Sequence, residues 1–74
     1  MIRTSKWLIE IIEVLISIGE KAHLSEIYEA VENRGNMDLK PRWKEIVRKT
    51  LSMKSNADVF YPIDGLGKGY WGLR

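Results

Sequence analysis

The chain has 74 residues, no cysteine and a formal net charge of +2, with 45% hydrophobic and 30% charged residues. This balance is typical of a folded domain rather than of a disordered chain, and the length allows a single domain, residues 1–74. The lack of cysteine excludes disulfides and thiolate zinc sites. It also fits a reducing compartment, and we therefore expect a cytoplasmic protein.

The longest apolar stretch, residues 7–18, is too short to cross a membrane. It has twelve residues and is interrupted by Glu10 and Glu13, whereas a membrane span requires about 20 apolar residues. The two acids also argue against a secretory leader, which has an uninterrupted apolar region. We expect no membrane partner.

The charges are distributed unevenly along the chain. Residues 1–39 carry four basic and seven acidic side chains, whereas residues 40–74 carry eight basic and three acidic ones. A basic half beside an acidic half suggests that one face meets a polyanion, although runs of charge are also common on ordinary solvated surfaces. The positions of the charges on the fold must decide between these interpretations.

The first predicted helix covers the apolar stretch. Thr4 or Ser5 is expected to cap its start, and Gly19 suits the position after its end. The main apolar stripe has helical spacing and contains Trp7, Leu8, Ile11, Ile12, Leu15 and Ile18. This spacing makes the helix the most distinct element of the sequence.

A short extended link at residues 22–23 leads to a second predicted helix. Ser25 is the expected N-cap, and residues 33–36 form a stop signal that contains Gly35. The apolar face of this helix contains Leu24, Ile27, Tyr28 and Val31.

A third helix is predicted to begin around Pro41, because proline is favoured at the first helical position, and to run to about Ser52. At about 100° per residue its side chains separate into two faces. The apolar face contains Trp43, Ile46, Val47, Thr50 and Leu51. The opposite face contains Arg42, Lys44, Glu45, Arg48, Lys49 and Ser52, and is therefore basic.

The rest of the chain has the pattern of a β-hairpin. Residues 59–63 and 70–73 are rich in aromatic and β-branched side chains, and residues 64–69, which connect them, contain three glycines. Pro62 has no amide proton, so the first strand should lie at a sheet edge or end there. Tyr70 and Trp71 should point to opposite sides of the second strand.

This order of elements predicts an α+β fold of the winged helix-turn-helix type, with three helices and a C-terminal hairpin as the wing. The third helix then occupies the position that enters the DNA major groove, and Lys68 lies at the tip of the wing. We expect double-stranded DNA as the partner. The predicted DNA-contact residues are Lys40, Arg42, Lys44, Arg48, Lys49, Ser52, Lys54 and Lys68.

Three segments resemble a known family: residues 42–51 (RWKEIVRKTL), 55–60 (SNADVF) and 67–74 (GKGYWGLR). They are similar to the winged-helix modules attached to restriction endonucleases of the HNH and Mrr types. Residues 24–28 (LSEIY) are also similar to HARE-HTH domains. The resemblance implies a module that recognises DNA, while a separate, attached nuclease domain cuts it.

The alternative to DNA binding is a protein-interaction or dimerisation module. Ile9, Val14 and Ile16 lie outside the main stripe of the first helix, so they are the expected face for a homodimer or another docking partner. A dimer formed in this way could still bind DNA, because it would present two basic helices to two half-sites.

Catalysis is not expected, and we predict no catalytic residue, cofactor or metal. His23 is the only histidine, whereas an HNH nuclease needs more than one and a zinc site would need other ligands beside it. Residues 65–69 superficially resemble a phosphate-binding loop. However, they precede a strand rather than a helix, and no serine or threonine follows Lys68.

Overall fold

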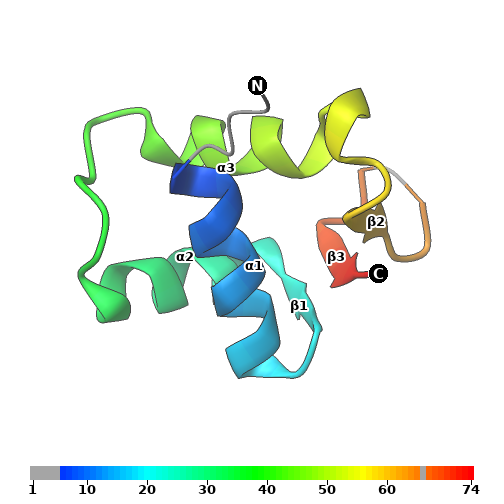
Figure 1. Cartoon of the computed structure of the whole chain (residues 1–74), viewed down its shortest axis with the longest axis horizontal. Coiled ribbons are helices and arrows are strands. Elements are labelled where there is room, and N and C mark those ends of the chain that lie inside the picture. The colour runs from blue at the N-terminus through cyan, green and yellow to red at the C-terminus, as the bar shows by residue number, and fades with distance from the viewer. Residues whose placement is uncertain (1–5, 66) are drawn as a thin grey trace.

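The computed structural model describes residues 6–65 and 67–74, which form an α+β fold (Figure 1). The elements in chain order are α1 (Lys6–Ile18), β1 (Lys21–His23), α2 (Leu24–Arg34), α3 (Trp43–Ser52), a short 3-10 turn η1 (Lys54–Asn56), β2 (Phe60–Pro62) and β3 (Tyr70–Leu73). The three predicted helices, the extended link and the hairpin are therefore all present. None of the helices among these residues is long and apolar enough to cross a lipid bilayer.

The three strands form one antiparallel sheet in the order β1-β3-β2. In the register, Trp71 of β3 lies between Ala22 of β1 and Pro62 of β2. Pro62 is the last residue of β2, which is an edge strand, so the sheet loses no central hydrogen bond to it. Tyr70 is 48% exposed and Trp71 only 8%, which confirms that they point to opposite sides.

Helix α1 ends as predicted, immediately before Gly19, which has a φ of 120°. The backbone amides of Gly19 and Glu20 both donate to the carbonyl of Leu15 and so close the last turn. The expected caps, Thr4 and Ser5, lie outside the described residues.

The N-cap of α2 is His23, and the prediction of Ser25 was wrong. The amide of Ser25 donates to His23 Nδ1 at 3.1 Å, and the amide of His23 donates to Glu26 Oε1 at 3.1 Å. This reciprocal pair is a capping box in which histidine replaces the usual serine or threonine. Histidine is outside the usual set of capping residues, so the sequence favoured the neighbouring serine. At the other end, Gly35 caps the helix in the left-handed conformation.

Helix α3 begins at Trp43, two residues later than predicted. Pro41 and Arg42 form a turn before it, so the proline precedes the helix instead of opening it. The predicted end at Ser52 is confirmed.

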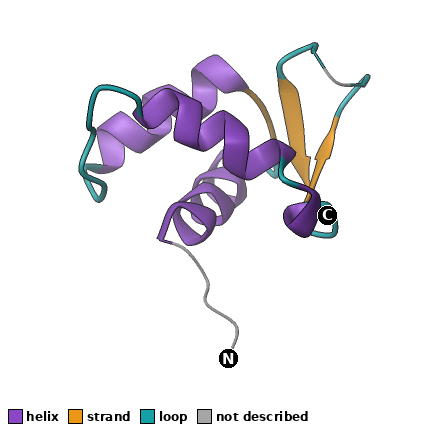
Figure 2. Ribbon diagram, turned by 90° about the horizontal axis from the view of Figure 1, so that it is seen from above, coloured by secondary structure: helices purple, strands orange, loops and turns teal. Residues whose placement is uncertain are grey.

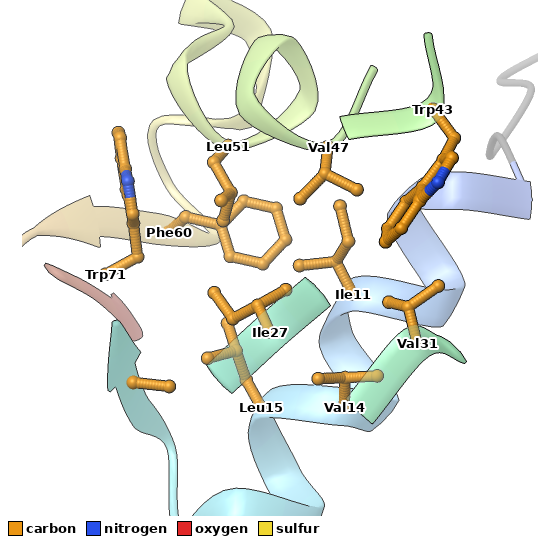
Figure 3. Packing of buried hydrophobic residues seen from close by; sticks show 11 residues of the cluster. Ile11, Val14, Leu15, Ile27, Val31, Trp43, Val47, Leu51, Phe60 and Trp71 are labelled. Atoms are coloured by element: carbon orange, nitrogen blue, oxygen red, sulfur yellow. The ribbon is translucent and has the colours of Figure 1, made fainter. Parts of the chain in front are cut away.

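All three helices and the sheet contribute to the core. Its buried members among the described residues are Ile11, Val14, Leu15, Ala22, Ile27, Val31, Trp43, Val47, Leu51, Phe60 and Trp71. Figure 3 shows the Phe60 ring of β2 beside Val47 of α3 and Ile11 of α1. Packing of β2 on α3 and α1 fixes the hairpin relative to the helices, because Phe60 is only 1% exposed.

The hairpin formed by β2 and β3 lies beside the helices. Figure 2 shows β2 and β3 side by side, with the turn between them at the opposite end from the C-terminus. The turn residues 64–65 and 67–68 are exposed, and so are Lys44, Arg48 and Lys49 on α3.

Candidate nucleic-acid interface

Helix α3 has one buried face and one exposed, mainly basic face. Its buried residues are Trp43, Val47, Thr50 and Leu51. Ile46 was expected among them but is 40% exposed, since it lies at the margin of the buried face. All eight predicted DNA-contact residues are exposed: Lys40, Arg42, Lys44, Arg48, Lys49, Ser52, Lys54 and Lys68.

A hollow of about 340 Å³ lies between the basic face of α3 and the hairpin turn. It is lined by Leu24, Arg48, Ser52, Gly67, Gly69 and Trp71. Gly67 and Gly69 have φ values of 89° and 83°, which glycine adopts without steric cost. Arg48 therefore lies in a concave surface whose opposite wall includes backbone without side chains, and a phosphate or base edge can approach it closely.

The predicted site residues do not all lie at this hollow. Lys40 lines a different hollow with Lys6, Trp7 and Ile46, on the other side of α3. Arg42 Nε lies 3.9 Å from a carboxylate oxygen of Glu45, so part of its charge is offset by an exposed neighbour. The α3 face and the hairpin turn are therefore the main candidates for contact, and Lys40 is peripheral.

Tyr28 of α2 belongs to the same surface, although the sequence did not indicate it. The ammonium of Lys44 lies 5.3 Å from the centre of the Tyr28 ring and 5.7 Å from the centre of the Trp43 ring. Burial raises the pKa of the Tyr28 hydroxyl, and the nearby Arg48 guanidinium partly opposes this shift. Helical spacing placed Tyr28 only on an apolar face, and nothing in the sequence pattern distinguished it from a core residue.

Two of the acidic side chains are neutralised within the fold, away from α3. Arg34 of α2 donates from Nε to Glu10 of α1 at 2.8 Å and from Nη2 to Glu13 at 2.7 Å. Hydrogen bonding to Glu10 is the main cause of the raised pKa of Arg34. Two of the seven acidic side chains in residues 1–39 therefore pair with Arg34 and stabilise the contact between α1 and α2.

Arg74 contacts the backbone before β2 and the ring of Tyr61 on β2. Its Nε donates to the carbonyl of Ala57 at 2.7 Å, and its guanidinium lies 5.4 Å from the centre of the Tyr61 ring. These contacts hold the end of the chain against β2. Arg74 was not among the predicted contact residues, yet it lines a hollow together with Ser52 at the end of α3.

The predicted second face of α1 is only partly exposed. Ile9 is 46% exposed and Ile16 57%, but Val14 is fully buried. Val14 was assigned to this face wrongly, because a helix packed on both α2 and the sheet buries more than one stripe. Ile9 and Ile16, two turns apart, remain as an exposed aliphatic pair.

Two further observations bear on function. The described part of the chain has no group of three histidine, aspartate or glutamate residues arranged to hold a metal ion. Comparison of the chain with protein-family models, curated protein sequences and solved structures gave no match.

Proposed function

We propose that this chain is a winged helix-turn-helix domain that binds double-stranded DNA through α3 and the turn between β2 and β3. The element order α1-β1-α2-α3-β2-β3 and the sheet order β1-β3-β2 support the winged-helix assignment. In this arrangement α2 and α3 form the helix-turn-helix pair, and the hairpin is the wing. We also propose a recognition role within a restriction system, on the resemblance of residues 42–51, 55–60 and 67–74 to winged-helix modules of restriction endonucleases.

The observation that carries the proposal is the exposed basic face of α3, on which Lys44, Arg48 and Lys49 have no acidic partner in the described part of the chain. Among residues 6–65 and 67–74, no carboxylate lies within 4.0 Å of a charged nitrogen of Lys44, Arg48 or Lys49. The B-DNA major groove is about 12 Å wide and admits one helix, with cationic side chains reaching phosphates and base edges. Lys68 on the wing would supply a further cation for the flanking backbone.

Reversing two charges on α3 tests this proposal. The double variant Arg48→Glu/Lys49→Glu should bind a labelled duplex at least about a hundredfold more weakly at low salt, because two cations become anions beside the phosphates. Fluorescence anisotropy over a salt series measures the effect. Both side chains are exposed, so the circular dichroism spectrum should remain that of the native chain.

The matched control is Lys6→Glu/Lys21→Glu, which changes the net charge equally. Lys21 lies on β1, and Lys6 lines the hollow on the other side of α3. This control should retain most of the affinity. Equal loss in both double variants would indicate attraction by net charge alone, and retention by the α3 variant would exclude α3 as the contact surface.

A second candidate function is a protein-docking or dimerisation module. The exposed pair of Ile9 and Ile16 on α1 favours it, because two large aliphatic side chains on one helix face leave apolar surface in water. Glu13, which lies between them on the helix, is already paired with Arg34. The two functions are compatible, since α1 and the basic face of α3 are different surfaces.

A further inference from the structure

We propose that Tyr28, Lys44 and Arg48 form one phosphate-binding cluster at the corner between α2 and α3, and that Tyr28 is the positioning residue for Lys44. The cluster would take a phosphodiester group of one DNA strand. This inference rests on the proposed function, and it adds a site and a residue role that the basic face of α3 alone does not imply.

The first argument is the arrangement of the two cations. Lys44 and Arg48 are one helical turn apart on α3, so their side chains leave the same face of the helix as neighbours. Neither has a carboxylate partner in the described part of the chain. A guanidinium that can donate two parallel hydrogen bonds and an adjacent ammonium match the oxygens of a phosphodiester.

The second argument is the aromatic support beneath Lys44. Its ammonium lies 5.3 Å from the Tyr28 ring centre and 5.7 Å from the Trp43 ring centre. The two rings contact each other edge to face, with centres 5.6 Å apart, and Trp43 is buried. Lys44 is therefore held over a rigid aromatic corner, whereas no ring contact is found for Lys49 or Lys68 in the described residues.

A lysine that is already positioned loses less conformational freedom when a phosphate binds. A free lysine side chain has many rotamers, and its ordering at an interface reduces affinity by about fivefold. The Tyr28 ring removes part of this cost before the ligand arrives. The charge of Arg48 acts on the same tyrosine, because it lowers the pKa of the Tyr28 hydroxyl against the larger, raising effect of burial.

Four variants test the cluster by anisotropy with a labelled duplex over a salt series. Lys44→Gln should reduce the slope of log affinity against log salt by about 0.9, which corresponds to one phosphate contact. Tyr28→Leu should weaken binding about three- to fivefold, because the ring is lost. Tyr28→Phe should bind like the native chain, since it keeps the ring. The double variant Tyr28→Leu/Lys44→Gln should be no weaker than Lys44→Gln alone.

Lys21→Gln is the control for the loss of one exposed lysine, and it should keep the native slope. Thermal unfolding monitored by circular dichroism identifies the temperature at which every variant is folded. If Tyr28→Leu does not fold, the salt slope of Lys44→Gln still decides whether the cluster binds a phosphate, and weaker binding by Tyr28→Phe would still overturn positioning by the ring.

The outcomes separate this inference from the proposed function. If the native chain binds the duplex while Lys44→Gln keeps the native slope, the cluster is wrong and DNA binding stands. Additive losses in the double variant, or a loss with Tyr28→Phe equal to that with Tyr28→Leu, would overturn the positioning role. If the native chain shows no salt-dependent binding, both proposals fail.

Discussion

Gly69, at the base of the hairpin turn, has a left-handed backbone and a hydrogen bond to the start of α2. Its φ is 83°, and its carbonyl accepts from the amide of Leu24 at 2.8 Å. A Cβ at this position would lie 2.7 Å from Nε2 of His23, the residue that caps α2. Gly69 therefore lets the turn and the start of α2 approach each other.

We predict that Gly69→Ala lowers the free energy of unfolding by about 2 kcal/mol or more. The left-handed backbone alone costs about 1–2 kcal/mol for a residue with a Cβ, and movement of the His23 ring would also weaken the cap of α2. Chemical denaturation measures the change.

Gly67→Ala is the matched control for this prediction. Gly67 has a similar φ of 89°, but an added Cβ would have nothing within 4 Å. The control should lose about 1–2 kcal/mol and less than Gly69→Ala, because it incurs the backbone cost without the contact. Equal losses in the two variants would show that the His23 contact contributes nothing.

At the scale of elements, an ion pair joins α1 to α2. Glu10 is 4% exposed, and its carboxylate accepts a hydrogen bond from Arg34 Nε at 2.8 Å. A buried carboxylate is stable only when it is paired, so this contact fixes how the two helices lie against each other. The Glu13 side chain shares the same arginine but is 50% exposed.

We predict that Glu10→Gln lowers the melting temperature by several degrees, whereas Glu13→Gln changes it little. The first variant replaces a buried, charge-assisted hydrogen bond, and the second removes an exposed ion pair that solvent already weakens. Thermal unfolding of the two variants at neutral pH gives the comparison. A larger effect at Glu13 would mean that the burial of Glu10 does not strengthen its pairing.

At the scale of the whole molecule, the basic surface and the exposed aliphatic pair lie on different helices. The basic face belongs to α3 beside the hairpin turn, and the aliphatic pair, Ile9 and Ile16, belongs to α1. The molecule can therefore offer one surface to a nucleic acid and another to a protein. A dimer formed through α1 would carry two α3 helices, and two recognition helices are needed to bind two half-sites.

The docking candidate predicts self-association through α1, which sedimentation equilibrium can measure. The apparent mass should rise above the 8.6 kDa of one chain as the concentration increases. The variant Ile9→Ser/Ile16→Ser should keep the mass of one chain at all concentrations, because the apolar contact is lost. A native chain that stays at 8.6 kDa throughout would contradict dimerisation through this face.

The sequence by itself determined the kind, order and approximate limits of the elements. Helical spacing located α1, α2 and α3, and the change to aromatic and β-branched residues located β2 and β3. Helical spacing also placed the buried Trp43 and the exposed Arg48 on different faces of α3. These features could be predicted because they depend on local backbone preference and on the regular repeat of side chains around one helix.

Only the tertiary structure decided which residues meet across elements. The pairing of Arg34 with Glu10, the position of Lys44 over Tyr28 and the burial of Val14 all join or enclose separate elements. The His23 ring, which caps α2, also lies edge to face against Tyr70 of β3, with ring centres 4.8 Å apart. Periodicity describes one element at a time, whereas the distance between side chains on different elements depends on how the whole chain packs.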